Sequence, residues 1–209
     1  MNEGAAAYLP DDPSDLAALR RASAGCEGCP LHRRATQTVF GEGSVQSSLV
    51  LVGEQPGDRE DRDGAPFVGP AGRLLDSALL DAGIDRRAVY LTNAVKHFKW
   101  RPQGARRLHQ TPSARERAAC RPWLVAELEA LRPRVVVCLG ATAGRALLGE
   151  SFRVGASRGR VLQSPYGRVV ATVHPSAVLR VADPDGREAA RSSLVEDLRL
   201  AARSAGADG

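Results

Sequence analysis

The stretch Ser48-Leu49-Val50-Leu51-Val52-Gly53-Glu54-Gln55-Pro56-Gly57 decides the predicted fold. Its apolar half predicts a buried strand, and a glycine-rich turn ends that strand. Strand-like runs recur at 88–92, 134–139 and 168–173, and helix-like segments at 15–24, 70–82, 113–131, 141–148 and 187–202. Helices that alternate with strands apolar on both faces are typical of a parallel sheet covered on two sides. We therefore predict a three-layer α/β/α fold with a central, mostly parallel four-stranded sheet.

Basic residues are concentrated in one part of the chain. The net charge is +5, and between Lys96 and Arg117 seven basic residues stand against one acidic residue. A long, basic segment that contains glycine is more often functional than merely connecting, so we expect residues 96–112 to form a basic loop at the site. A solvated, flexible loop is the alternative. The 209 residues suit a single domain, 1–209, in which residues from 1 to about 13 are expected to be flexible.

The sequence shows no sign of a membrane or secretory segment. No apolar run approaches the ~20 residues that cross a bilayer. Residues 1–19 hold four acidic and no basic residues, whereas a secretory signal begins with positive charge. We expect a cytoplasmic, monomeric protein, and its bias toward arginine and alanine indicates a bacterial source.

Polar side chains follow the predicted strands at their carboxyl ends. Glu54 and Gln55 follow the first strand, Asn93 the second, and His174 and Ser176 the last. Ligands of such sheets bind beyond this edge, so we expect these side chains to meet there. The Asn93 carboxamide suits the edge of a nucleic-acid base, His174 can stabilise negative charge, and Ser176 can hold a phosphate. Taken alone, each residue also fits an ordinary turn or helix cap.

The segment Pro66-Phe67-Val68-Gly69-Pro70 places an aromatic side chain just before a predicted helix. Phe67 can stack on a base from this position. The alternative is a hydrophobic staple that only fixes the start of the helix.

Four cysteines are present, at Cys26, Cys29, Cys120 and Cys138. An intracellular chain seldom forms disulfides, which leaves a metal site or coincidence. One CxxC pair with two distant single cysteines suits an iron–sulfur cluster better than zinc, which more often takes two such pairs. Alternatively, Cys138 is a small core residue, because it lies in an apolar strand.

Taken together and in this order, the motifs resemble the uracil-DNA glycosylase superfamily. The segments GEQPG (53–57), PFVGPAG (66–72), TNAVKH (92–97) and HPS (174–176) are similar to those of its bacterial iron–sulfur branch. The segment RRLH (106–109) is similar to the loop of the UdgX group, whose members become covalently attached to DNA. That loop usually begins with lysine, and Ala105 in its place removes one positive charge. The resemblance runs from about Cys26 to the last predicted helix.

The resemblance implies how a base would be recognised. Phe67 would stack on a flipped uracil, and Asn93 would read its N3 and O4 edge. His174 would stabilise the departing O2 atom, and Gln55 would contribute to catalysis and base binding through its backbone.

The resemblance also implies a covalent step, a cofactor and DNA contacts. His109 would be the nucleophile that captures the sugar, and Glu54 would orient His109 and take its proton. A [4Fe–4S] cluster would be held by Cys26, Cys29, Cys120 and Cys138. DNA would be bound by Lys96, Arg106, Arg107 and Ser176.

The implied function is removal of uracil from DNA, preferably single-stranded, followed by covalent attachment at His109. One alternative is a turnover uracil glycosylase that releases an abasic site. Another is a non-catalytic iron–sulfur protein that binds DNA or senses redox state. The match of Phe67, Asn93 and His174 to base-reading positions argues against this last alternative.

Overall fold

The computed structural model describes residues 4–206 and contains a five-stranded sheet in the order β2-β1-β5-β7-β6. Its strands are β1 Leu49–Gly53, β2 Val89–Asn93, β5 Val135–Leu139, β6 Val161–Ser164 and β7 Gly167–Thr172. The first, second, third and last of these run parallel, whereas β6 pairs antiparallel with β7 at one edge. The mostly parallel sheet is confirmed, with five strands instead of four. The additional strand is short and half-exposed, so it lacks the apolar run that marks the others.

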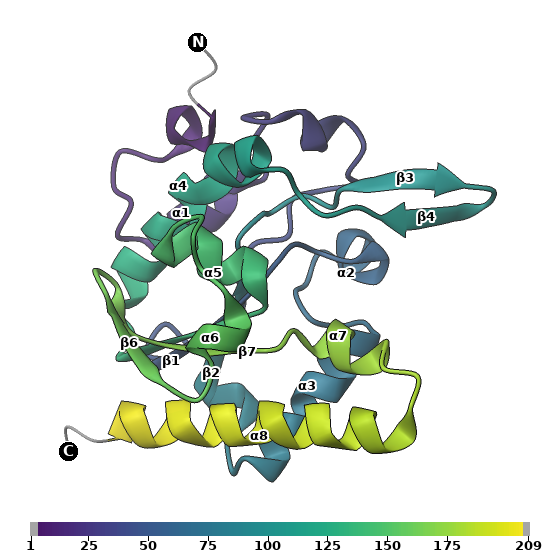
Figure 1. The fold of residues 1–209 in the computed structure, drawn as a ribbon. Coiled ribbons are helices and arrows are strands. Elements are labelled where there is room, and N and C mark those ends of the chain that lie inside the picture. Colours follow the sequence, from purple (N-terminus) through teal and green to yellow (C-terminus); the bar gives the residue numbers. More distant parts are fainter. Residues whose placement is uncertain (1–3, 207–209) are drawn as a thin grey trace.

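Helices cover both faces of the sheet (Figure 1). They are η1 Gly4–Tyr8, α1 Leu16–Ser23, η2 Pro30–Arg33, α2 Asp58–Asp63, α3 Pro70–Asp81, η3 Arg86–Ala88, α4 Ala114–Leu131, α5 Ala141–Leu148, α6 Val154–Ser157, α7 Pro175–Leu179 and α8 Pro184–Gly206, where η marks a short 3-10 helix. Within residues 4–206, no helix is long and apolar enough to span a membrane.

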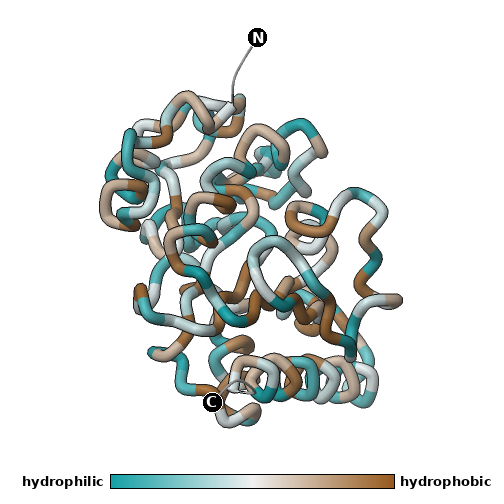
Figure 2. The backbone as a smooth tube through the Cα atoms, turned by 90° about the vertical axis from the view of Figure 1, so that its left-hand side faces the viewer, coloured by the Kyte–Doolittle hydropathy of each residue, from teal (hydrophilic) through white to brown (hydrophobic). Residues whose placement is uncertain are grey.

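Neighbouring residues of β1 face opposite helical layers. Leu51 packs in one core cluster with apolar side chains of α3 and α8, while Val50 and Val52 pack in a second cluster with those of α4 and α5. All five residues of the strand are buried. Figure 2 shows the hydrophobic stretches running through the centre of the molecule, with α8 alternating between hydrophobic and hydrophilic residues along its length. The predicted three-layer α/β/α class is confirmed.

The N-terminal segment packs onto α4. Gly4 and Ala5 of η1 are buried, and a Cβ added to Gly4 would lie 2.8 Å from the Ala119 carbonyl oxygen. The expectation of flexibility up to about residue 13 is therefore wrong for residues 4–8, and residues 1–3 lie outside the described part. Together with α1 and α4, this segment encloses a third core cluster that contains three of the four cysteines.

Residues 96–112 contain a β-hairpin, where a loop was expected. Its strands are β3 Trp100–Gln103 and β4 Arg106–His109, and they pair antiparallel with Trp100 opposite His109. Gly104 adopts φ 58°, the left-handed conformation that a two-residue hairpin turn requires. The hairpin projects from the body of the molecule (Figure 1). Its strands are largely exposed and rich in arginine, so no apolar alternation marks them in the sequence.

Candidate functional site

The carboxyl ends of β1, β2, β5 and β7 meet at one edge of the sheet, as predicted. Gly53 of β1 is the register partner of Asn93 in β2. Gly140, which follows β5, donates its N–H to the Thr172 carbonyl of β7 over 2.9 Å. A Cβ added to Gly140 would lie 3.1 Å from the Cβ of His174. The turn after β1 and the segment after β7 therefore lie on the same edge.

Phe67 and Asn93 lie together beside Gly53. A Cβ on Gly53 would lie 2.3 Å from Asn93 Oδ1 and 2.7 Å from Phe67 Cζ, so the close approach requires glycine. Both side chains are buried. The Phe67 ring also lies near-parallel to the ring of His174, with centroids 6.3 Å apart. Among residues 4–206 the Asn93 carboxamide has no hydrogen-bond partner, so its donor and acceptor are available to a ligand.

His174 is a neutral ring held in one tautomer at the start of α7. Its Nδ1 accepts the Ser176 backbone N–H over 3.1 Å, so the proton of the neutral ring lies on Nε2. Burial, reinforced by the charge of Arg180 and by the second titratable ring of His109, lowers the pKa of His174 to about 4. The ring therefore offers an Nε2–H donor at neutral pH without carrying a positive charge.

The hairpin brings His109 against Glu54. His109 Nε2 lies 3.4 Å from Glu54 Oε1, and the His109 side chain remains 47% exposed. Thr142 of α5 donates its hydroxyl to the other carboxylate oxygen of Glu54, which fixes the direction of the carboxylate. Burial and the charge of Arg180 lower the pKa of His109, and Glu54 opposes them only in part. A neutral, accessible imidazole beside a carboxylate is the arrangement of an activated nucleophile.

The side chain of Gln55 binds backbone groups of the two residues that flank the β-hairpin, Lys99 and Gln110. Its Oε1 accepts the Lys99 N–H over 3.0 Å, and its Nε2 donates to the carbonyl oxygens of Lys99 and Gln110 over 3.2 and 3.1 Å. Both amide hydrogens are therefore used within the protein, which agrees with the prediction that Gln55 would contact a base through its backbone and not through its side chain. Only its backbone remains for a ligand.

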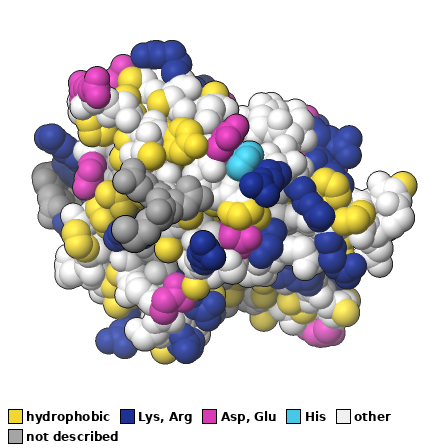
Figure 3. All heavy atoms as spheres, turned by 90° about the horizontal axis from the view of Figure 1, so that it is seen from above, with side chains coloured by type: hydrophobic (Ala, Val, Ile, Leu, Met, Phe, Trp, Pro, Cys, Tyr) yellow, Lys and Arg dark blue, Asp and Glu magenta, His cyan; other side chains and the backbone are white. Residues whose placement is uncertain are grey.

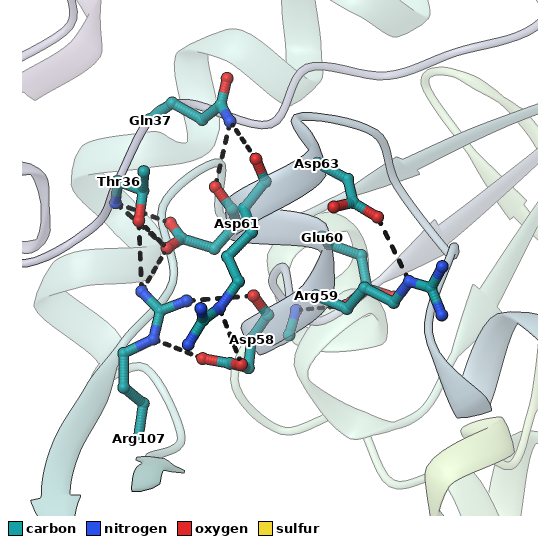
Figure 4. Close-up of polar contacts among 10 residues, drawn as sticks. Thr36, Gln37, Asp58, Arg59, Glu60, Asp61, Asp63 and Arg107 are labelled. Atoms are coloured by element: carbon teal, nitrogen blue, oxygen red, sulfur yellow. Dashed lines mark hydrogen bonds and ion pairs between the residues drawn. The ribbon is translucent and has the colours of Figure 1, made fainter. Parts of the chain in front are cut away.

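Arg107 is anchored to α2 and not presented to DNA (Figure 4). Its Nε pairs with Asp58, its Nη1 lies 2.6 Å from Asp61 Oδ2, and the side chain is only 14% exposed. Its guanidinium also lies over the rings of Phe98 and Trp100. The predicted DNA contact of Arg107 is therefore replaced by a structural one.

Lys96 is entirely buried, and the prediction that it binds DNA is wrong. Its ammonium group pairs with Glu127, whose side chain is equally buried, and donates to Thr92 Oγ1 and to the Asn93 carbonyl over 2.6 and 2.9 Å. All three ammonium hydrogens thus have acceptors inside the protein. The pair lies directly behind the strand end that carries Asn93 and cannot meet a phosphate.

Exposed positive charge remains near the site. Arg106 is exposed on the hairpin. Arg180, which the sequence analysis missed, donates its Nη1 to Ser176 Oγ over 3.1 Å and lowers the pKa values of both site histidines. Its position four residues after Ser176 on a short helix was the signal that could have identified it. Figure 3 shows Lys and Arg side chains gathered on the half of the face from which the hairpin projects.

Three cysteines share one core cluster, and Cys138 is not among them. Cys26, Cys29 and Cys120 belong to the core cluster under α1 and α4, where burial, with the other two cysteines among its further causes, raises the pKa of Cys120 to about 12. The Trp123 indole donates to Cys26 Sγ, and the Lys96 N–H donates to Cys120 Sγ, both over 3.2 Å. Cys138 packs with Val52 and Ala143 in the cluster above the sheet, and its pKa is raised by burial alone.

Three thiols with N–H donors on two sulfurs fit an iron–sulfur cluster, but Cys138 does not fit as its fourth ligand. Within residues 4–206 no three His, Cys, Asp or Glu side chains converge closely enough to hold one metal ion. A cluster binds each thiolate through a different iron, so its ligands lie farther apart than those of a single ion. The prediction is corrected for Cys138 because its side chain lies in a different core cluster, packed against the sheet, from that of the other three cysteines.

A base-reading carboxamide, an aromatic ring and a neutral histidine at one sheet edge define a candidate base-binding site in an α/β protein. The chain belongs to the uracil-DNA glycosylase superfamily, since residues 40–199 match the family model described as "Uracil DNA glycosylase superfamily".

Curated relatives agree with this assignment. The chain is 43% identical over 157 residues to a type-4 uracil-DNA glycosylase of Thermotoga maritima, covering 74% of this chain and 78% of the relative. It is 37% identical over 194 residues to the type-4 uracil-DNA glycosylase of Pyrobaculum aerophilum, covering 89% and 92%. A type-5 uracil-DNA glycosylase of the same organism is 32% identical over 199 residues, covering 85% and 83%. The expected superfamily is confirmed, and the closer resemblance to the UdgX group stays a prediction.

Proposed function

We propose that the protein removes uracil from DNA and then captures the sugar covalently through His109. The observation that carries this proposal is the 3.4 Å approach of His109 Nε2 to Glu54 Oε1, on the same sheet edge as Phe67, Asn93 and His174. The relatives named as uracil-DNA glycosylases support the base-removal step. The capture step is supported by the hairpin, which carries an exposed and neutral imidazole to that edge.

Base removal begins with a nucleotide turned out of the strand. Flipping costs a few kcal/mol, and least in single-stranded DNA, while stacking on Phe67 returns ~1–3 kcal/mol. The Asn93 carboxamide accepts N3–H and donates to O4, which distinguishes uracil from cytosine. When the C1′–N1 bond breaks, its electron pair leaves with the uracil. The Nε2–H of His174 donates to O2 and stabilises this developing anion.

Capture uses the cationic sugar that base removal leaves behind. A ring nitrogen of His109 forms a bond to C1′, and the proton on its other nitrogen passes to Glu54. Losing this proton matters because the sugar-bound ring is then neutral. It could leave the sugar only as an imidazolate anion, which is a poor leaving group. The adduct therefore persists, and each protein molecule reacts once.

The DNA backbone would run along the exposed basic residues near the site. Arg106 and Ser176 keep the DNA-binding role expected for them, and Arg180 joins them in place of Lys96 and Arg107. Contacts of this kind are to phosphates, so binding weakens as salt increases. A single strand is the favoured substrate because it needs no unpairing before the base is flipped.

A denaturing gel tests the proposed function directly. The protein is incubated with single-stranded DNA that contains one uracil, boiled in detergent and separated by size, and free uracil is measured in parallel. Covalent capture predicts a slow-migrating band together with released uracil. Released uracil without the band would establish the turnover alternative, and binding without either would establish the non-catalytic one.

Replacing Glu54 with glutamine should slow covalent capture by about 100-fold, because the proton acceptor for the His109 ring is lost. Thr142 still has an oxygen to which it can donate, so the side chain keeps its place. The measurement is the rate at which the detergent-stable band appears. Arg59→Gln, an exposed substitution on neighbouring α2, serves as control and should leave this rate unchanged. An unaltered rate in Glu54→Gln would remove Glu54 from the mechanism.

A [4Fe–4S] cluster held by Cys26, Cys29 and Cys120 is the cofactor we propose, with His97 as the fourth ligand. His97 is buried and follows Lys96, whose N–H donates to Cys120 Sγ. Its pKa is lowered to about 4 by burial and by His32, whose ring contacts the Cys29 carbonyl at 2.7 Å. A neutral imidazole beside these thiols is a suitable iron ligand. Such a cluster would tie the N-terminal segment to α4 and to the chain after β2.

Iron content separates His97 from Cys138. Cys138→Ala should keep the iron and sulfide content and the visible absorption of the purified protein, because its side chain lies in a different core cluster from the other three cysteines. His97→Ala should lower both, and His97→Cys should restore them. Loss of iron in Cys138→Ala, with full iron in His97→Ala, would reverse this assignment.

A further inference from the structure

Glu60 is a buried carboxylate that joins two loops of the site. It lies on α2 and is only 8% exposed. Its Oε2 accepts the Gly57 N–H over 3.1 Å, and its Oε1 accepts the Gly69 N–H over 2.8 Å (Figure 4 shows Glu60 on α2). The first bond is ordinary capping at the start of a helix. The second reaches nine residues along the chain, and helix capping does not explain it.

Both loops leave space for this carboxylate. A Cβ added to Gly57 would lie 2.6 Å from Glu60 Oε2, and one added to Gly69 would lie 2.9 Å from Glu60 Oε1. Glycine at both positions therefore lets two backbone amides reach the same side chain. The two glycines and the carboxylate form one connection between segments that do not otherwise pair as strands.

Each of the two loops carries part of the base-binding site. Gly57 ends the turn that begins at Glu54, and Gly69 lies two residues after Phe67. Phe67 adopts φ 58°, which is costly for an aromatic residue and persists only where its surroundings hold it. A Cβ at Gly72 would lie 1.7 Å from the Phe67 carbonyl oxygen, so α3 packs tightly behind this residue. The position of the Phe67 ring thus depends on how its segment is held at both ends.

The same short helix also holds the nucleophile's hairpin. Asp58 and Asp61 bind Arg107 of β4, as Figure 4 shows, while Glu60 reaches back to the two loops. This six-residue helix therefore connects the hairpin to the Phe67 segment through its side chains. Glu60 and the two aspartates have separate partners, so the contribution of Glu60 can be measured separately from theirs.

We propose that Glu60 is a positioning residue for base removal, which holds the Phe67 segment against the turn after β1 so that uracil fits between them. This inference rests on the proposed function. An ionised carboxylate can accept both amides at once, because each of its oxygens is an acceptor. The carboxamide of glutamine keeps one acceptor and turns a donor toward the other N–H, so one loop is released while the side-chain volume is conserved.

The test measures uracil release with protein in excess over uracil-containing single-stranded DNA, where the rate does not depend on turnover or capture. Glu60→Gln should lower this rate about 10- to 100-fold, since a buried N–H loses a charge-assisted partner. Free uracil should also compete less well for the site. Affinity for uracil-free DNA should not change, because the Glu60 carboxylate is bonded to buried backbone and not presented to DNA.

Glu188→Gln is the matched control, because it makes the same chemical change at an exposed position of α8 and should keep the wild-type rate. The melting temperature gives the folded fraction of each variant. A wild-type release rate per folded molecule, with only a lower melting temperature, would overturn the proposal and leave Glu60 a purely structural residue. If Glu60→Gln does not fold, Glu60→Asp, whose shorter side chain cannot span both amides, is judged by the same criterion. The wild-type rate itself decides the proposed function, whereas the ratio of variant to wild type decides the role of Glu60.

Discussion

Replacing His109 with serine should abolish the detergent-stable protein–DNA band while uracil is still released. The residues proposed for base removal, Phe67, Asn93 and His174, lie at the sheet edge, and their positions do not depend on the His109 ring. Serine leaves room beside Glu54, so water can attack the cationic sugar. The product should then be an abasic site, which alkali cleaves and which a sequencing gel detects.

Leu108→Ser provides the control for this prediction, because Leu108 is an exposed residue directly before His109 on β4 and its side chain points to the opposite face of the hairpin. It should form the covalent band as the wild type does. A band that persists in His109→Ser would assign the nucleophile to another residue. If His109→Ser neither releases uracil nor forms the band, His109 would belong to base removal itself.

Replacing His174 with alanine should lower the rate of uracil release about 10²- to 10³-fold, the usual effect of removing one donor to a developing anion. The tautomer explains the size of this effect, since Nδ1 is occupied by Ser176 and Nε2–H is left to face the base. With its pKa lowered to about 4, His174 remains neutral well below physiological pH. Its titration should therefore leave the release rate constant between about pH 5 and pH 8.

Ser176→Ala is the matched control for His174→Ala. It removes the hydroxyl that contacts Nδ1 but keeps the backbone N–H donor, so the tautomer is preserved and the loss should be much smaller. Release by His174→Ala at close to the wild-type rate would show that another group stabilises the departing base. Measurements with protein in excess over DNA keep the capture step from influencing either result.

The sequence predicts the sheet edge well because local patterns determine it. Apolar runs followed by Glu54, Asn93 and His174 identify strand ends, and parallel strands bring such ends together. The edge strand β6 and the hairpin are not predictable in this way, because exposed strands need no apolar alternation. Their existence depends on pairing between segments, which short-range patterns do not encode.

The errors at the site have a common physical cause, because residue type does not specify burial or direction. Lys96 lies among basic residues in the sequence, yet its ammonium group is buried against Glu127 from a distant helix. Cys138 follows three valines in a strand, where successive side chains point to opposite layers, and only the packing shows which layer it faces. Thr142 carries no motif, and its contact with Glu54 exists only because α5 follows the neighbouring strand.

The hairpin is joined to the body of the protein by the carboxamide of Gln55, which binds the residues flanking its two strands, and by the guanidinium of Arg107, which binds α2 from close to the hairpin turn. The hairpin forms a two-stranded sheet of its own and contributes no strand to the central sheet. In the proposed function, covalent capture therefore depends on a segment that is separate from the strand ends proposed to remove the base. The hairpin is accordingly the segment to exchange when the proposed covalent step is to be removed from this protein, or introduced into a relative, without changing the sheet edge.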